Sequence, residues 1–360
     1  MSAPRDAHVL VARLDSVGDV LLSGPAVRAV AASSRRVTML VGPGRGAVAR
    51  LLPGVDDVLE FEASWIVADP GPLDPAAVED LVRTLREADV DAALVLTSFH
   101  QSPLPLALLL RLAGVGWVGA ISDDYPGSLL DLRHRLPEVP ADVAESERAL
   151  SLARAAGFDL PGPARLAVRQ PLPDVSALVG PQPYVVYHPG ADAPARRPGA
   201  AKSRELVAAL VGAGHRVVVT GSRGEADLTA SVASGLALDL AGAVDLAGLA
   251  AVLAGAEVVV APNTGPAHLA AAVGTPVVSL FAPVVPPERW APYGVPVVLL
   301  GDQDAPCRLT RARHCPVPGH PCLDDVAASD VVAAVAELRQ APPADHHPTV
   351  PARPREVDHV

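Results

Sequence analysis

The sequence contains little lysine, few aromatic residues and only three cysteines. Aromatic residues make up 3% of the 360 positions, and Lys202 is the only lysine, so arginine carries nearly all of the positive charge. Alanine, valine and leucine must therefore fill the core, and an isolated arginine indicates little about function. Three cysteines cannot form a closed set of disulfides, and they suit a reducing compartment.

Long apolar runs are also missing. No stretch reaches about 18 uncharged apolar residues, because Arg111, His215 and Glu257 interrupt the nearest candidates. The first residues lack the basic region and unbroken apolar stretch of a signal peptide, so we expect a cytoplasmic protein. The net charge of −11 argues against a broad face that binds nucleic acid, but it allows a local pocket for a phosphate.

Short β-branched runs alternate with longer stretches rich in alanine and leucine, which predicts an α/β protein with parallel sheets covered by helices on both faces. A proline-rich stretch at 168–183 separates two series of such units. We therefore expect two Rossmann-like domains facing each other across a cleft, at 1–172 and 173–340, and a disordered tail at 341–360. Strands are expected at 8–14, 37–42, 92–98, 184–190, 215–221, 256–262 and 276–282, and helices at 19–33, 76–88, 143–157, 202–213, 224–234, 246–255 and 266–273.

The stretch APNTGPAHLAAAVGTP (261–276) leaves a strand through an Asn-Thr-Gly-Pro turn and places His268 in an alanine-rich helix. Asn and Thr are favoured at a helix N-cap, and Pro is favoured in the first turn. The free backbone N–H groups of this helix would point into the cleft, at the sheet edge where α/β proteins bind phosphates. An ordinary capped helix with an incidental histidine is the alternative.

Two more loops of the second half follow strands and carry groups that suit a nucleotide. YHPGADAPARRPG (187–199) holds a basic pair, and VTGSRGEADL (219–228) holds glycines and Glu225. Arginines and backbone amides bind phosphates, and a carboxylate binds ribose hydroxyls. Taken singly, each charge is better explained as a solvated surface group, but three such loops in one half together favour a nucleotide site. Neither GxGxxG nor GxxxxGK[ST] occurs, which disfavours a dehydrogenase or a P-loop NTPase.

In the first half, RLDSVGDVLL (13–22) continues from a strand into a helix. Gly18 would permit a tight turn, and Asp19 would lie at the helix start, where a carboxylate is favoured. There it could accept a proton from an incoming hydroxyl. The alternative is that Asp19 or Asp15 is simply the N-cap. The segment TSFHQS (97–102) ends another strand and is expected to line the same side, although His100 is equally explained as a loop residue.

Together these segments resemble glycosyltransferase family 9, the ADP-heptose:lipopolysaccharide heptosyltransferases, over about residues 8–338. RLDSVGDVLLSGPAVRAV (13–30) is similar to the family's opening R-x4-GD-x5-PA-x-R-A pattern, and HPGADAPARRPG (188–199) resembles its HPGA segment. The longest match is NTGPAHLAAAVGTPVVSLFAPVVPPERWAPYG (263–294), which resembles the family's [DN][TS]GPxHLAAAxGTPVVxLFGP segment and the RWxPYG that follows it.

The resemblance implies a GT-B fold in which the first domain binds the acceptor and the second binds the nucleotide sugar. It implies an inverting, metal-independent transfer of heptose from ADP-heptose to a saccharide or lipid-linked saccharide, as in lipopolysaccharide core biosynthesis, with no cofactor. Because such acceptors are lipid-linked, transient contact with the inner face of the cytoplasmic membrane is expected, and no nucleic-acid partner.

The resemblance also assigns roles to residues. Asp19 matches the general base, Arg196 and His268 match groups at the leaving diphosphate, and Glu225 matches a ribose-binding acid. The expected acceptor side comprises Arg13, Gly18, Ser98 and His100. The expected donor side comprises Gly190, Arg197, Thr220, Gly221, Glu225, Val244, Asn263, Thr264 and Gly265.

Three departures from the family pattern leave the sugar open: Asn263 where Asp is frequent, Pro198 in place of Trp, and Arg196 in place of Lys. The alternatives are another nucleotide sugar for a different cell-surface glycan, a GT-B nucleotide-sugar epimerase, and a catalytically idle binding protein. The cysteine-rich stretch CRLTRARHCPVPGHPC (307–322) has spacing that is irregular for zinc. We expect a packed loop there, with metal binding as the alternative.

Overall fold

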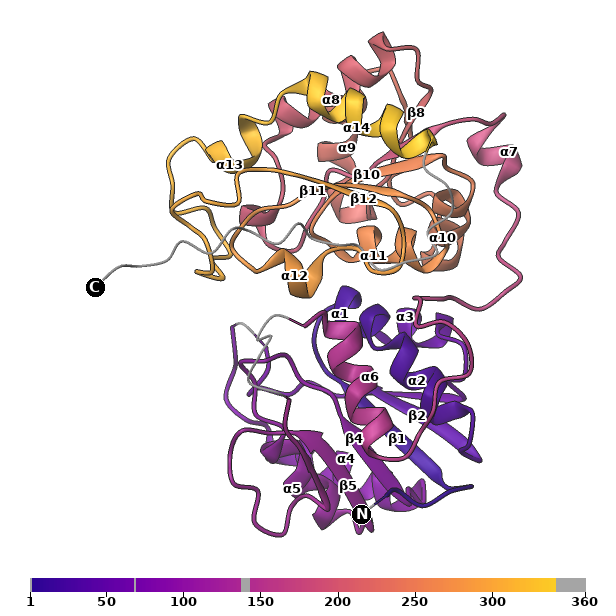
Figure 1. Cartoon of the computed structure of the whole chain (residues 1–360), viewed down its shortest axis with the longest axis vertical. Helices are drawn as coiled ribbons and strands as arrows, with labels where there is room; N and C mark the ends of the chain where they lie inside the picture. Colours follow the sequence, from indigo (N-terminus) through magenta and orange to yellow (C-terminus); the bar gives the residue numbers. More distant parts are fainter. Residues whose placement is uncertain (1, 68, 137–142, 341–360) are drawn as a thin grey trace, which may run out of the picture.

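The chain forms two six-stranded parallel sheets, one in each half of the molecule (Figure 1). The computed structural model describes residues 2–67, 69–136 and 143–340. The first sheet contains β1 (His8–Arg13), β2 (Arg36–Val41), β3 (Asp57–Glu60), β4 (Ala92–Val95), β5 (Trp117–Ile121) and β6 (Leu132–His134). The second contains β7 (Val185–Tyr187), β8 (Val217–Val219), β9 (Leu238–Asp239), β10 (Val258–Pro262), β11 (Val277–Leu280) and β12 (Val297–Leu300).

Both sheets have the same topology. The first runs β3-β2-β1-β4-β5-β6 and the second runs β12-β11-β10-β7-β8-β9, so each has the Rossmann order 3-2-1-4-5-6 counted from its own first strand. In the first sheet, successive strands are added on one side of β1 and then, from β4 onward, on the other side. The same change of side occurs between β7 and β10 in the second sheet. Ligands of such sheets bind beyond the carboxyl ends of the strands at these two points.

Helices cover both faces of each sheet. The first half contains α1 (Val17–Leu22), α2 (Gly24–Ala31), α3 (Gly46–Leu51), α4 (Pro75–Glu87), α5 (Leu104–Leu112) and α6 (Glu145–Ala155). The second contains α7 (Ser176–Val179), α8 (Ala200–Gly212), α9 (Ala226–Ala233), α10 (Leu246–Ala254), α11 (Gly265–Ala272), α12 (Pro287–Trp290), α13 (Pro321–Asp324), α14 (Ala328–Gln340) and the 3-10 helices η1 (Pro194–Arg196) and η2 (Arg223–Glu225).

Alternate residues of each strand are buried on opposite faces of the sheet, as the pleat requires. On β1, Val9 and Val11 belong to the core that α2 and α6 complete, whereas Leu10 and Ala12 belong to the core beneath α4 and α5. The first of these cores continues into the second half through residues such as Leu269 of α11. One apolar cluster therefore joins the two halves, and Figure 1 shows α1 facing α11 and α12 across the middle of the molecule.

All seven expected strands are present, and the α/β class with parallel sheets is confirmed. The expected helix 19–33 is two helices, because Pro25 lacks the N–H that would continue the first into the second. The sequence patterns missed β3, β5, β6, β9 and β12; of these, β6 and β9 have only two or three residues and no fully buried position. The limits 1–172 and 173–340 remain predictions, and the tail 341–360 lies outside the described residues.

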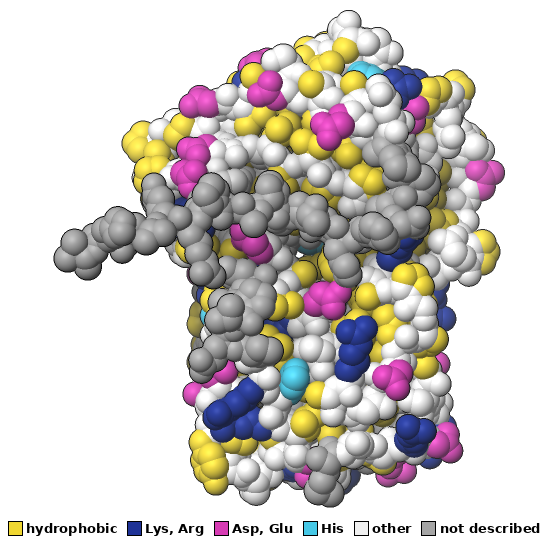
Figure 2. Space-filling view, in the orientation of Figure 1, with side chains coloured by type: hydrophobic (Ala, Val, Ile, Leu, Met, Phe, Trp, Pro, Cys, Tyr) yellow, Lys and Arg dark blue, Asp and Glu magenta, His cyan; other side chains and the backbone are white. Residues whose placement is uncertain are grey.

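On the face shown in Figure 2, acidic and basic side chains are interspersed over both halves rather than gathered by sign. Among the described residues, no helix combines the length and the apolar character needed to cross a bilayer.

Candidate functional site

A cavity of about 500 Å³ lies between the halves, at the points where the strand orders reverse. This volume is within the usual range of roughly 300–1,000 Å³ for small-molecule sites. Loops after β1, β2, β3 and β4 form one wall, and segments after β7, β10, β11 and β12 form the other. Of the residues expected from the sequence, the cavity is lined by Gly18, Asp19, Ser98, His100, Arg196, Asn263, Thr264, Gly265 and His268.

Asp19 lies in the first turn of α1, but it is not the N-cap. Ser16 is the N-cap, and Asp19 is its capping-box partner: the Asp19 carboxylate accepts hydrogen bonds from Ser16 Oγ (2.7 Å) and Ser16 N (3.3 Å). The other carboxylate oxygen accepts from Arg13 Nη2 at 2.9 Å. The alternative in which Asp19 or Asp15 caps the helix is therefore wrong, and Asp19 faces the cavity.

Arg13 is 2% exposed and holds three carboxylates around one guanidinium. Its nitrogens lie 2.9 Å from Asp15, 2.9 Å from Asp19 and 3.2 Å from Glu145. Burial acts to raise the pKa of all three carboxyl groups. For Asp15 and Glu145 burial wins over the charge of Arg13, so their pKa values are raised, whereas Arg13 together with hydrogen bonds lowers the pKa of Asp19. Asp19 is thus the member of the cluster that stays ionised most readily.

The opposite wall begins with α11, whose N-cap is Thr264 with Pro266 in the first turn. The Thr264 side chain makes no capping hydrogen bond to the described chain, so it does not block the helix start. His268 is 3% exposed, and burial, reinforced by the charge of Arg196, lowers its pKa to about 4 against the opposing effect of Asp19. The imidazole is therefore neutral near pH 7, and its Nδ1 has no hydrogen-bond partner in the described chain.

Gly18 has a different role from the one expected. Its φ is not positive, so the turn does not require glycine. A Cβ on Gly18 would lie 2.7 Å from His268 Cδ2, and a Cβ on Gly265 would lie 2.9 Å from Val17 Cγ1. Because each glycine lacks a Cβ, a side chain from the opposite half can pack directly against its backbone, and α1 and α11 can lie close together.

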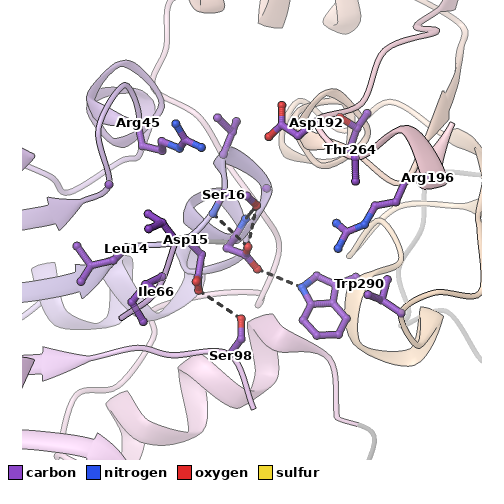
Figure 3. Close-up of a pocket in the computed structure, with 18 of the residues that line it drawn as sticks. Leu14, Asp15, Ser16, Arg45, Ile66, Ser98, Asp192, Arg196, Thr264 and Trp290 are labelled. Carbon is purple, nitrogen blue, oxygen red and sulfur yellow. Dashed lines mark hydrogen bonds between the residues drawn. The ribbon is translucent and has the colours of Figure 1, made fainter. Parts of the chain in front are cut away.

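Positive charge on the second wall comes from arginines. Arg196 and Thr264 extend from the second half toward Ser16 and Asp15 of the first (Figure 3). Arg311 and Arg313 also line the cavity, although sequence reasoning gave them no role. Three guanidinium groups and a helix start on one wall suit an anion with several phosphate oxygens.

The remaining expected donor residues form a second group, beside the cavity but not among its lining residues. A Cβ on Gly190 would lie 1.8 Å from Glu225 Oε1, so the Glu225 side chain covers the backbone of the loop after β7. Glu225 itself accepts hydrogen bonds from Ser222 N and Oγ in a capping box, and Ser222 together with the charge of Arg197 keeps its pKa low despite burial. Gly242 N donates to Gly221 O, which places the loop containing Val244 next to this group.

Two further expected residues do not line the cavity themselves. Thr220 Oγ1 shares a hydrogen bond with His188 Nδ1 at 3.1 Å. Arg13 is buried behind the residues that line the cavity. In the cysteine-rich stretch no disulfide joins Cys307, Cys315 or Cys322, and no group of three or more His, Cys, Asp or Glu side chains in the described ranges is arranged to hold a metal ion.

Several contacts cross from one half to the other, and the sequence predicted no role for most of the residues that make them. Trp290 Nε1 donates to Asp19 Oδ1 at 3.1 Å (Figure 3). Arg311 Nη2 lies 2.6 Å from His100 Nε2, and Arg289 pairs with Glu145 at 3.6 Å. Trp290 is one of three tryptophans in the sequence, and it belongs to the RWxPYG segment of the family resemblance, which could have drawn attention to it.

The sequence was compared with family models, and residues 78–320, about two thirds of the chain, match the model of glycosyltransferase family 9 (heptosyltransferase). The chain belongs to glycosyltransferase family 9. Lipopolysaccharide heptosyltransferase 1 of Pseudomonas aeruginosa is 37% identical over 135 residues, which cover 37% of this chain and 38% of that protein. Lipopolysaccharide heptosyltransferase 3 of Escherichia coli is 32% identical over 166 residues, which cover 44% of this chain and 47% of that protein.

The matches to these two family members thus span less than half of their own lengths. The solved structure of E. coli ADP-heptose lipopolysaccharide heptosyltransferase II aligns with a TM-score of 0.71 at 21% identity, over 92% of this chain and 98% of that one. This confirms the GT-B fold of two Rossmann-like units that the family resemblance implied.

Proposed function

We propose that this family 9 protein transfers heptose from ADP-heptose to a hydroxyl of a saccharide or lipid-linked saccharide, with inversion and without a metal ion. One observation carries the proposal: the Asp19 carboxylate, whose pKa is lowered despite burial by Arg13 and hydrogen bonds, faces the same cavity as Arg196 and the start of α11, which suit an anion. The heptosyltransferase relatives suggest the sugar and the lipopolysaccharide acceptor.

In this mechanism the acceptor hydroxyl donates its proton to Asp19 as its oxygen bonds to the anomeric carbon of the donor. The bond between that carbon and the phosphate oxygen breaks, and its electron pair leaves with the nucleoside diphosphate. Because the base and the anion-binding wall lie on opposite sides of the cavity, the entering and leaving oxygens would lie on opposite faces of the sugar. A single displacement of this kind inverts the anomeric centre.

The second wall would stabilise the charge that develops on the diphosphate. Arg196 supplies a guanidinium, the start of α11 supplies backbone N–H groups, and His268 supplies a neutral imidazole N–H. Preorganised donors of this kind are often the largest contribution to catalysis. They would serve in place of the divalent metal that other transferases use, and Glu225 beside Gly190 would meet the ribose.

The test is calorimetric titration of the purified protein with ADP, UDP and GDP, each with Mg²⁺ and with a chelator. We expect binding of ADP that the chelator does not weaken, and a loss of about tenfold in affinity in His268→Ala, because one hydrogen bond to an anion is removed. The matched control is His215→Ala, since His215 precedes the amino end of β8, whereas the cavity lies beyond the carboxyl ends of the strands.

Stronger binding of UDP or GDP than of ADP would contradict the assignment of heptose but keep the site. Binding that needs Mg²⁺ would contradict metal independence. If none of the three nucleotides binds, the donor site itself is wrong. A transfer assay with ADP-heptose then tests catalysis separately from binding.

A further inference from the structure

Every acceptor position of the Asp19 carboxylate is occupied. Oδ1 accepts from Arg13 Nη2 (2.9 Å) and Trp290 Nε1 (3.1 Å), and Oδ2 accepts from Ser16 Oγ (2.7 Å) and Ser16 N (3.3 Å). An ionised carboxylate offers about four lone-pair positions. A general base must accept a hydrogen bond from the group it deprotonates. An acceptor hydroxyl can therefore reach Asp19 only if one of these donors withdraws.

Three of the four donors are fixed. Arg13 is 2% exposed, and its withdrawal would separate a buried guanidinium from Asp15, Asp19 and Glu145 at once. The Ser16 N–H belongs to the capping box that starts α1, and the Ser16 hydroxyl is held beside Asp19 because its oxygen accepts from Asp19 N in the same box. These groups all come from the same half of the molecule as Asp19.

Trp290 differs from the other three donors in place and in surroundings. It comes from α12 of the second half, it is only partly buried, and both Trp290 and Asp19 line the cavity. Figure 3 shows its indole reaching across the cavity to the first wall. Ser16 also lines the cavity, but it forms the start of α1, so Trp290 is the donor that a ligand can displace without disturbing that helix.

The residues that flank Trp290 hold α12 against the first half. The Arg289 guanidinium lies 3.6 Å from Glu145 and 4.5 Å from the centre of the Phe99 ring. The Tyr293 hydroxyl donates to Glu147 of α6, and the Trp290 ring lies 6.0 Å from the ring of Phe99. While the contacts of Arg289 and Tyr293 stay in place, a rotation of the Trp290 side chain would change only its ring contact with Phe99 and would free one acceptor position of Oδ1.

We propose that Trp290 is an exchangeable donor: its indole N–H occupies Asp19 Oδ1 in the absence of acceptor and gives up this position to the acceptor hydroxyl. This inference rests on the proposed function, in which Asp19 is the base. Trp290 is accordingly a positioning residue, since it controls both acceptor affinity and the readiness of Asp19 to take a proton.

The electrostatics of the site agree with this exchange. The Trp290 hydrogen bond is among the interactions that lower the pKa of Asp19, after the charge of Arg13 and the hydrogen bond of Ser16. Its withdrawal would raise that pKa at the moment when the proton must be accepted. The other charged or titratable groups that act on Asp19 are Asp15, His100, Glu145, Arg196 and His268.

The first experiment compares Trp290→Phe with wild type in transfer from ADP-heptose to a deacylated lipopolysaccharide core oligosaccharide. Phenylalanine keeps an aromatic ring but has no N–H. We expect the KM for the oligosaccharide to fall about five- to tenfold, because no hydrogen bond to a charged group has to be broken, while the KM for the donor stays the same. Trp65→Phe is the matched control, since Trp65 contacts Phe61 in the first half and does not line the cavity.

The pH profile gives a second readout that a merely structural role would not move. The base must be ionised, so kcat/KM for the oligosaccharide falls on the acidic side as Asp19 is protonated. Trp290→Phe removes an interaction that lowers the pKa of Asp19, so this acidic limb should move to higher pH. Trp65→Phe should leave it in place.

A third readout needs no turnover. In protein labelled with ¹⁵N-tryptophan, the indole signal absent from Trp290→Phe identifies Trp290. Saturation with the oligosaccharide should shift this signal, and the signals of Trp65 and Trp117 should stay where they are.

An unchanged Trp290 signal at saturation would overturn the proposal, as would a Trp290→Phe variant with an unaltered or raised KM and an unmoved acidic limb. Failure of the proposed function looks different: the oligosaccharide binds and shifts the Trp290 signal, but no heptose is transferred. An oligosaccharide that does not bind, while ADP does, contradicts the exchange and the acceptor together and leaves the donor site intact.

Discussion

The two halves have the same strand order and opposite charge at the edges that face each other. Beyond β1 and β4, carboxylates dominate: Asp15, Asp19 and Glu145 all lie within 3.2 Å of the Arg13 guanidinium. Beyond β7 and β10, cations dominate. The residues there and in the neighbouring loop that lines the cavity include Arg196, Arg311 and Arg313.

One strand order thus carries two walls of different charge. The Rossmann order brings loops from two strands to one point, but the side chains on those loops decide what binds there. A carboxylate wall suits a hydroxyl that must lose a proton, and a cationic wall with a helix start suits a diphosphate that must gain charge.

The comparison is tested most strongly by Asp19→Asn. The amide cannot take a proton, so transfer should fall by about 10²–10⁴-fold in kcat, the usual contribution of a general base. Binding of ADP should not weaken, because Asp19 belongs to the opposite wall and its negative charge, which acts on Arg196 and His268, opposes a bound anion.

Product formation from ADP-heptose measures the first quantity, and calorimetry measures the second. An Asp19→Asn variant that transfers sugar at the wild-type rate would show that Asp19 is not the general base. One that loses ADP binding would show that the two walls do not have separate tasks.

How much of this site the sequence predicts depends on whether its residues come from loops or from contacts between the halves. Asp19, Arg196 and His268 were found because each follows a strand, and parallel strands of one sheet end at a common edge. That reasoning needs only local patterns. It predicted the two walls and the cavity between them.

Glu145 and Trp290 were missed for a physical reason. Neither lies in a loop at the end of a strand: Glu145 begins α6, and Trp290 ends α12. Their partners belong to distant segments, so their roles depend on how the halves pack. The expectation that Gly18 permits a tight turn was wrong for the same reason. Glycine is required there by a close neighbour, His268, which comes from the other half.

Substitution of adjacent arginines sharpens the description of the cationic wall. Arg196 lines the cavity and Arg197 does not, although both were expected to bind the donor. Arg196→Ala should weaken ADP binding by about 10–100-fold, the loss expected for a hydrogen bond between charged groups. Arg197→Ala should have a smaller effect, through its neighbour Glu225. Calorimetry measures the ADP affinity of both variants. Equal losses of affinity would mean that the anion contacts Arg197 as well as Arg196.

The smallest expected effect concerns the contact between the walls. Gly18→Ala places a Cβ 2.7 Å from His268 Cδ2, so the buried ring or the backbone has to shift. We expect a loss of about 1–2 kcal/mol in the free energy of unfolding, as for overpacking in a core. The matched control is Gly24→Ala in α2, where the nearest atom to a new Cβ is Leu52 Cδ2 at 3.6 Å.

Gly24→Ala should be neutral or stabilising by about 0.5–1 kcal/mol, because alanine is the better helix former. Urea unfolding of both variants measures the difference, and ADP titration shows whether displacement of His268 also weakens the anion site. If Gly18→Ala is as stable as Gly24→Ala and binds ADP as wild type does, then His268 yields easily and the two walls are not held in close contact by this pair of helices. If only Gly18→Ala loses both stability and ADP affinity, the carboxylate wall and the cationic wall share a rigid boundary at Gly18, and the charge on each is fixed in position relative to the other.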